Sequence, residues 1–291
     1  MAQVVAVHGV GQQGAGPHQL HQDWYPALRD GLAAAGVSDS SEVSLVCAFY
    51  GSLFRPAGQV LATGDPPYRA DDVNDPFEVG FLHALWAQAA ATDPRVLGPE
   101  AEDTMLATPR SIQRALDALS NSRFFAGLAE RTLIFDLKQV REYFRDPTLR
   151  YAAREQVARV VDNDTRVIVA HSLGSVVAYE ALCAHPEWPI RSFVTLGSPL
   201  GIRNLIFERL EPPPAPLDSS PLRNGIWPGS ARSWTNIADA GDLVALVKDL
   251  RPRFGPRVEN FLVDNGATVH SILPYLSAKE TGHAIVKGLE N

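Results

Sequence analysis

One serine in the chain stands in a setting that favours nucleophilic chemistry. The segment 170–174, AHSLG, follows the apolar run 166–169, RVIV, and precedes a helix-like run, 175–182, SVVAYEAL. A strand, a sharp turn with serine at its apex and a helix form the layout of a nucleophile elbow. A serine hydroxyl is a weak nucleophile unless a base lies beside it and backbone N–H groups face the oxyanion. The segment therefore predicts Ser172 as a nucleophile, with an ordinary helix N-cap serine as the alternative.

An acid for this serine is expected later in the chain, followed by a histidine, because strands later in the sheet place their loops beside the elbow. The segment 234–244, WTNIADAGDLV, is typical of a strand that runs into a loop with two aspartates. We favour Asp242 as the acid. Asp239 ends the strand and is the alternative, with a structural role in which it accepts hydrogen bonds from loop N–H groups. Asp264 is a weaker candidate, because an aspartate before Asn-Gly is typical of a turn.

The base is predicted to be His270, which follows the last predicted strand and a polar turn. The role requires that Nε2 reach the hydroxyl of Ser172 while Nδ1 donates to a carboxylate. Otherwise His270 is a surface histidine in a loop. His283 competes for the role, but it lies within the last predicted helix. His171 is expected to point away from the nucleophile and to pack or line a pocket.

The first predicted strand, 4–7, ends in the glycine-rich segment 8–11, HGVG, where an oxyanion loop belongs. One oxyanion donor would be the N–H of Leu173, the residue after the nucleophile, and we assign the second to Val10. The glycines at 9, 11 and 14 also match the G-x-G-x-x-G pattern of a dinucleotide loop. Against that alternative, no clear acidic strand end follows about 20 residues on. The pattern also leaves the distant serine, aspartate and histidine unexplained.

Short apolar runs alternate with helix-like runs along the chain. Strands are predicted at 4–7, 43–50, 166–169, 190–196, 233–238 and 258–263, and helices at about 24–35, 150–161, 175–182 and 274–289. This alternation predicts an α/β fold with a mainly parallel sheet and helices on both faces. We expect residues 1–291 to form a single domain.

Two segments interrupt this alternation. Residues at about 51–145 are loop-like at first and helix-like from 76 onward, which predicts a helical insert that forms a cap. Its aromatic residues either line an apolar substrate site or pack the insert against the sheet; they are Phe77, Phe81, Trp86, Phe124 and Phe125. The proline-rich run 211–216 predicts a surface loop or a lid within about 200–230.

The composition bounds the partners and the compartment. With 45% hydrophobic and 20% charged residues, the chain is typical of a folded soluble protein. Its formal net charge of -7 and lack of a basic cluster argue against nucleic acid as a partner. We predict a cytoplasmic protein, because there is no signal peptide and no apolar run of about 18 residues that would span a membrane. Its two cysteines, Cys47 and Cys183, are predicted to be separate thiols.

Taken together, four segments resemble the α/β-hydrolase superfamily, particularly its lipase-like and GPI-inositol-deacylase-like serine esterases. They are the His8-Gly9 loop, the 170–174 elbow, the 236–244 segment and His270. Ala170 stands where the elbow usually has glycine, and the insert at about 51–145 matches nothing we can name. The resemblance implies a catalytic triad of Ser172, Asp242 and His270, with no metal or organic cofactor.

The expected activity is hydrolysis of a small-molecule carboxylic ester through an acyl-enzyme. The same groups would serve a thioesterase, a peptidase or an amidase. A non-catalytic binding protein of the same fold is the alternative from another class. The sequence does not choose the acyl chain length or the oligomeric state.

Overall fold

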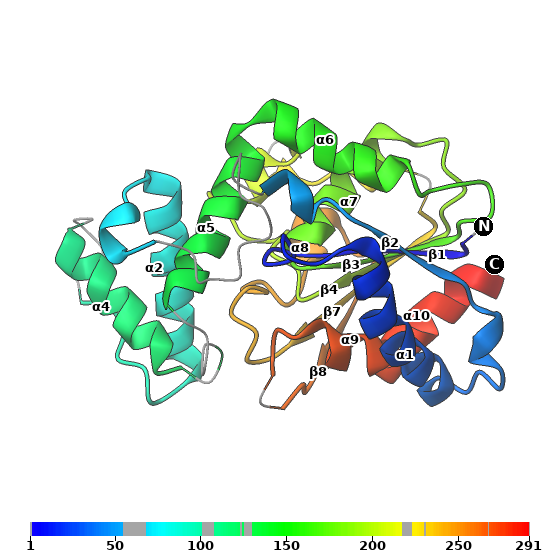
Figure 1. Cartoon of the computed structure of the whole chain (residues 1–291), viewed down its shortest axis with the longest axis horizontal. Helices are drawn as coiled ribbons and strands as arrows, with labels where there is room; N and C mark the ends of the chain where they lie inside the picture. Colours follow the sequence, from blue (N-terminus) through cyan, green and yellow to red (C-terminus); the bar gives the residue numbers. More distant parts are fainter. Residues whose placement is uncertain are drawn as a thin grey trace.

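The computed structural model describes residues 2–54, 68–100, 108–122, 124, 130–216, 223–229, 231–266 and 268–290. Six strands form one parallel sheet in the order β2-β1-β3-β4-β7-β8 (Figure 1). The strands are β1 (Val4–Val7), β2 (Leu45–Ala48), β3 (Val167–His171), β4 (Ser192–Leu196), β7 (Ser233–Asp239) and β8 (Val258–Val263). A separate antiparallel pair is formed by β5 (Ala215–Pro216) and β6 (Arg223–Asn224). The predicted fold class, α/β with a mainly parallel sheet, is confirmed.

The central strands are apolar on both faces, because helices cover both sides of the sheet. Side chains alternate between faces along a strand. In β1, Val5 and Val7 belong to one hydrophobic core and Val4 and Ala6 to the other. This continuous burial explains why the strands are short uninterrupted apolar runs in the sequence.

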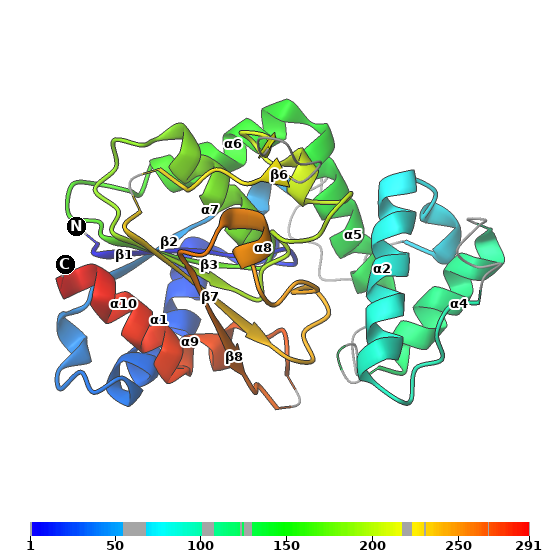
Figure 2. The same ribbon diagram turned by 180° about the vertical axis from the view of Figure 1, so that it is seen from behind.

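Each face of the sheet has its own helical layer, as the two opposite views show (Figures 1 and 2). One layer holds α1 (Pro17–Ala34), α9 (Ile272–Ser277) and α10 (Lys279–Glu290), and the other holds α6 (Pro147–Ala158) and α7 (Leu173–Ala184), with the short α8 (Arg251–Phe254) near its edge. Helices α1 and α10 touch at two glycines, since a Cβ built on Gly282 would lie 2.0 Å from the carbonyl oxygen of Gly31.

The insert between β2 and β3 is helical, as predicted. It contains α2 (Pro76–Thr92), α4 (Pro109–Ser120) and α5 (Glu130–Arg145). Asp75 caps α2 by accepting from Phe77 N–H, and Thr108 caps α4 in a reciprocal pair with Ser111. Helices α2 and α4 form a lobe beside the sheet, and α5 lies between that lobe and α6 (Figure 1).

Short 3-10 turns complete the described elements, at Ser40–Glu42, Gly51–Phe54, Ala70–Asp72 and Phe207–Arg209. The proline-rich segment begins at Glu211, whose carboxylate pairs with Arg150 and Arg154 of α6. These ion pairs fix the start of this loop on the outer helical layer. Whether the loop acts as a lid stays a prediction.

Several element boundaries differ from the sequence prediction; the first helix, for example, begins at Pro17 rather than at about 24. The closing helix, expected at 274–289, is two helices, because Ala278 adopts an extended conformation and the Thr281 hydroxyl bonds to the carbonyl of Tyr275. The second strand covers only Leu45–Ala48, the four residues that pair with β1. The crossover helix begins at Pro147, because Asp146 caps it.

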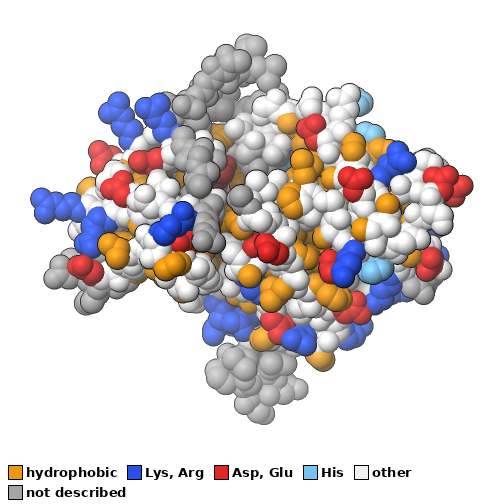
Figure 3. All heavy atoms as spheres, turned by 90° about the horizontal axis from the view of Figure 1, so that it is seen from below, with side chains coloured by type: hydrophobic (Ala, Val, Ile, Leu, Met, Phe, Trp, Pro, Cys, Tyr) orange, Lys and Arg blue, Asp and Glu red, His pale blue; other side chains and the backbone are white. Residues whose placement is uncertain are grey.

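The charge of the surface, the apolar length of the helices and the state of the two cysteines bear on other predictions made from the sequence. Figure 3 shows acidic and basic side chains interspersed over one face, without a basic surface of the kind that phosphates need. No helix among the described residues is both long and apolar enough to cross a membrane. Cys47 and Cys183 are free thiols, as predicted.

Candidate active site

Ser172 occupies a strained turn between β3 and α7. Its backbone has φ 53° and ψ −131°, a conformation that non-glycine residues rarely adopt. The turn is tight because α7 starts against β1: a Cβ on Gly174 would lie 2.2 Å from the carbonyl oxygen of His8. The Ser172 side chain makes no helix-capping hydrogen bond. The N-cap alternative therefore does not describe it.

The loops after β3, β7 and β8 bring three predicted residues together. His270 Nε2 lies 3.1 Å from Ser172 Oγ, and His270 Nδ1 lies 2.8 Å from Asp242 Oδ2. An ionised carboxylate only accepts, so Nδ1–H donates to Asp242 and Nε2 is left to accept from the serine hydroxyl. Ser172 and Asp242 are buried, whereas the His270 side chain is 22% exposed. The arrangement has the connectivity of a serine–histidine–aspartate relay.

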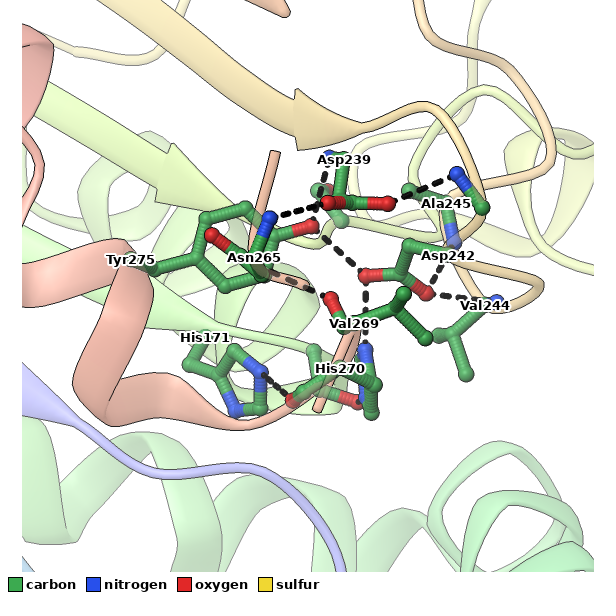
Figure 4. Close-up of polar contacts among 12 residues, drawn as sticks. His171, Asp239, Asp242, Val244, Ala245, Asn265, Val269, His270 and Tyr275 are labelled. Carbon is green, nitrogen blue, oxygen red and sulfur yellow. Dashed lines mark hydrogen bonds and ion pairs between the residues drawn. The ribbon is translucent and has the colours of Figure 1, made fainter. Parts of the chain in front are cut away.

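Asp242 is held as a carboxylate by four hydrogen bonds (Figure 4). Oδ1 accepts from the backbone N–H groups of Val244 and Ala245, and Oδ2 accepts from His270 and from the Tyr275 hydroxyl at 2.8 Å. Burial alone would raise the pKa of Asp242, but the charge and hydrogen bond of His270, with the bond from Tyr275, leave it below its usual value. The group is therefore ionised at neutral pH.

The alternative candidates have other partners. Asp239 accepts from the N–H groups of Gly241 and Asn265 and so joins two loops, the structural role considered for it. Asp264 accepts from the N–H of Gly266 in a turn. His283 is exposed on α10 and lies outside the hydrogen-bonded cluster around Ser172.

Two residues that the sequence did not assign to the site complete the cluster. The Tyr275 hydroxyl accepts from the N–H of Asp239 at 2.7 Å while it donates to Asp242, so it links both aspartates. His171 Nε2–H donates to the carbonyl of His270 at 2.9 Å and fixes the backbone of the base. Burial, assisted by the charge of His270, lowers the pKa of His171 to about 3 and keeps it neutral.

The loop after β1 is fixed beside Ser172 by His8. Nδ1–H of His8 donates to the carbonyl of Gly9, and its Nε2 accepts from the N–H groups of Tyr50 and Gly51. Burial lowers the pKa of His8 to about 4, so the ring stays neutral and keeps this tautomer. A Cβ on Gly9 would lie 2.7 Å from Ser172 Cβ. The backbone that leads to Val10 is thus held against Ser172.

The predicted oxyanion donors lie on these two elements. Leu173 is the first residue of α7, directly after the nucleophile, and Val10 directly follows Gly9. Their function as donors stays a prediction. The same loop differs from a dinucleotide loop, in which a helix begins at the glycines. Here α1 begins only at Pro17, and Gly14 has open space around its Cα.

A cavity of about 340 Å³ is lined by residues that flank Asp242 and His270 in the sequence, while Ser172, Asp242 and His270 themselves are not part of its walls. Its walls come from the insert and from the loops after β7 and β8, and they include Ala89, Thr92, Phe124, Gly241, Leu243 and Val269. The ring centre of Phe124 is 5.6 Å from that of His270. Among the aromatic residues predicted to line a site, Phe77, Phe81 and Trp86 are buried in the core of the insert, and Phe125 lies outside the described residues.

Within the described residues, no group of three histidine, cysteine or acidic side chains is placed to hold a metal ion. Comparison of the chain with protein-family models, curated proteins and solved structures finds no match. The fold and the site together define a parallel α/β protein with hydrogen-bonded serine, histidine and aspartate at the carboxyl edge of its sheet.

Proposed function

We propose that this protein is a serine hydrolase of the α/β-hydrolase type that cleaves carboxylic esters through an acyl-enzyme. The observation that carries the proposal is the unbroken hydrogen-bonded series from Ser172 through His270 to Asp242. The strained backbone at Ser172 supports it, because such strain is typical of a nucleophile held out of a sheet.

The reaction follows from the positions of these atoms. Ser172 Oγ attacks the ester carbonyl and gives its proton to His270 Nε2, while Asp242 stays ionised and stabilises the imidazolium. The N–H groups of Leu173 and Val10 would hold the oxyanion. The carbon–oxygen bond to the alcohol then breaks as His270 protonates the leaving alkoxide. Water, deprotonated by His270, attacks the acyl-serine and releases the acid.

The cavity beside the loops of Asp242 and His270 is the proposed place for part of the substrate. Its walls combine apolar residues of the insert with loop residues around Asp242 and His270, which suits a small acyl or alcohol group. Thioester and amide cleavage need the same three groups, and turnover of a substrate panel distinguishes the three bonds. A binding protein of this fold would not need a serine within 3.1 Å of a histidine base.

Labelling with a fluorophosphonate probe tests the proposal. Wild-type protein is expected to react at Ser172, and Ser172→Ala is expected to lose all labelling and at least about 10,000-fold of its ester turnover. Ser277→Ala, a change at a half-buried serine of α9, is the matched control and should react like wild type. Folded wild-type protein that neither reacts with the probe nor cleaves any member of an ester, thioester and peptide panel would contradict the proposal.

A further inference from the structure

Asp136, on the insert helix α5, is a half-buried acid with one fully buried carboxylate oxygen, and the relay does not use it. Other buried acids of the described chain have clear partners. Glu78 pairs with Lys138 and Arg141, and Glu180 pairs with Arg150. Oδ1 of Asp136, in contrast, is fully buried and accepts no hydrogen bond from any described residue. A buried polar atom without a partner costs free energy, so its presence calls for a functional explanation.

The carboxyl lies close to the loop after β1, which carries the predicted oxyanion donor Val10. A Cβ built on Gly11 would lie 3.7 Å from Asp136 Oδ1, and Gly11 directly follows Val10 in the predicted oxyanion loop. One turn along α5, Gln139 accepts from the N–H of Gly11, so the same helix face contacts the loop twice. Asp136 is also close enough to His270 for their charges to interact. The carboxyl therefore lies beside the predicted oxyanion loop and within electrostatic range of His270.

We propose that Asp136 recognises the substrate by accepting a hydrogen bond from a donor group, a hydroxyl or an ammonium, close to the scissile ester. This inference rests on the proposed function, and it narrows the substrate class from esters in general to esters that carry such a donor. Burial raises the pKa of Asp136 to about 7, which the charge of His270 opposes, so a cationic or donor partner would be favoured there. An anionic substituent would be repelled.

Pairs of esters of similar size test whether Asp136 accepts from a hydroxyl or from an ammonium group. On the acyl side, ethyl butanoate is compared with ethyl 3-hydroxypropanoate and ethyl 3-aminopropanoate, and an ethyl malonate half-ester supplies the anion. On the alcohol side, propyl butanoate is compared with 2-hydroxyethyl butanoate. We expect wild-type protein to prefer a donor-bearing ester over its alkyl isostere by about 10- to 100-fold in kcat/KM on one of the two sides. The malonate half-ester should be the poorest substrate.

Variants at Asp136 then distinguish the two donors. Asp136→Leu, with Asp136→Ala as a second truncation, should remove the preference, because kcat/KM falls more for the donor-bearing ester than for its alkyl isostere. Asp136→Asn keeps an acceptor oxygen but no charge. It should therefore retain a preference for the hydroxyl and lose one for the ammonium. Glu142→Gln, a change at a half-exposed carboxylate of the same helix, is the matched control and should keep the wild-type ratios.

Fluorophosphonate labelling separates failure of this inference from failure of the proposed function. If wild type and Asp136→Leu are both labelled and their substrate ratios are equal, Asp136 does not recognise the substrate and the hydrolase proposal stands. If wild type is not labelled and cleaves none of these esters, both proposals are overturned. A wild-type preference for the malonate half-ester would also overturn the inference.

Discussion

The two sides of Ser172 differ in how completely their buried polar groups are paired. On the sheet side, Asp242, Asp239 and Tyr275 are joined to one another and to backbone N–H groups in one network (Figure 4). On the insert side, Asp136 faces the oxyanion loop with a buried oxygen that no described residue satisfies. One side of the site is complete without a ligand, and the other is not.

Under the proposed function, this difference assigns the chemical step to the sheet side and substrate selection to the insert side. A proton relay works only if its donors and acceptors are fixed before the substrate arrives, so full pairing on the sheet side is expected. Selectivity instead needs a polar group whose partner comes from the substrate, because an analogue without that partner then leaves the group unpaired. Changes on the sheet side should therefore reduce turnover of every ester, and changes at Asp136 should alter which ester is preferred.

Among the variants that test this comparison, Gly197→Ala is expected to lower turnover the most. Gly197 has φ +54°, and a Cβ there would lie 2.7 Å from Asp242 Oδ2 and 3.1 Å from His270 Nδ1. The methyl group must displace the acid from the base, so we expect kcat to fall by about 100- to 1000-fold for all esters. Turnover of matched alkyl and donor-bearing esters measures this loss and should show their ratio unchanged.

Gly36→Ala is the matched control, because Gly36 also has a positive φ of +89° but no atom within 4 Å of its added Cβ. Both changes should destabilise the fold by roughly 1 kcal/mol of backbone strain. Only Gly197→Ala should lose activity. Equal activity of the two variants would show that the geometry of the acid and base is not what limits turnover.

A second effect concerns stability on the insert side. The folded-state pKa of Asp136, about 7, is raised above the value of 3.8 for a free carboxyl. Its contribution to stability is therefore fully present below about pH 4 and is lost as pH rises to 7. Relative to Asp136→Asn, the free energy of unfolding of wild type should fall over this window by as much as about 4 kcal/mol.

Denaturant unfolding of both proteins at several pH values gives this difference directly. Buried His8 and His171, whose pKa values are lowered, make both proteins less stable as pH falls below 6.5, so their effect cancels in the comparison. A difference between the two proteins that does not change with pH would mean that Asp136 has a partner in the folded chain.

The smallest effect is expected from Tyr275→Phe. This change removes one of four hydrogen bonds to Asp242 but keeps the ring that packs in the core. We expect about a tenfold loss of kcat and about 1 kcal/mol of stability. Tyr151→Phe, at a tyrosine that is 58% exposed, should change neither. A variant of Tyr275 as active as wild type would show that the remaining three bonds suffice to hold the acid.

The sequence was sufficient to predict the sheet and the meeting of Ser172, Asp242 and His270 at one edge of it, whereas their catalytic roles stay a prediction. Each of Ser172, Asp242 and His270 directly follows or closely follows an apolar strand, and parallel strands place their ends at one edge. Strand and helix ends were less predictable, because pairing partners and caps decide them. The break at Ala278, for example, depends on a bond between Thr281 and Tyr275 that no periodicity indicates.

The supporting residues were missed because their types are common in ordinary roles. Tyr275 lies in a helix where a tyrosine usually signals core packing, and only the fold shows that its hydroxyl reaches Asp242. Asp136 lies between the buried residues Leu133, Ile134 and Leu137 of an amphipathic helix, where an acid is normally solvated. The position of an acid so close to the apolar face of this helix was the one sequence feature that could have indicated its burial.

The most direct test of the relay is the mass of the intact protein during turnover of p-nitrophenyl butanoate. The account predicts a burst of about one p-nitrophenol per chain and a transient gain of one butanoyl group, located on the peptide that contains Ser172. Turnover without this adduct, or an adduct on another residue that persists in Ser172→Ala, would contradict it.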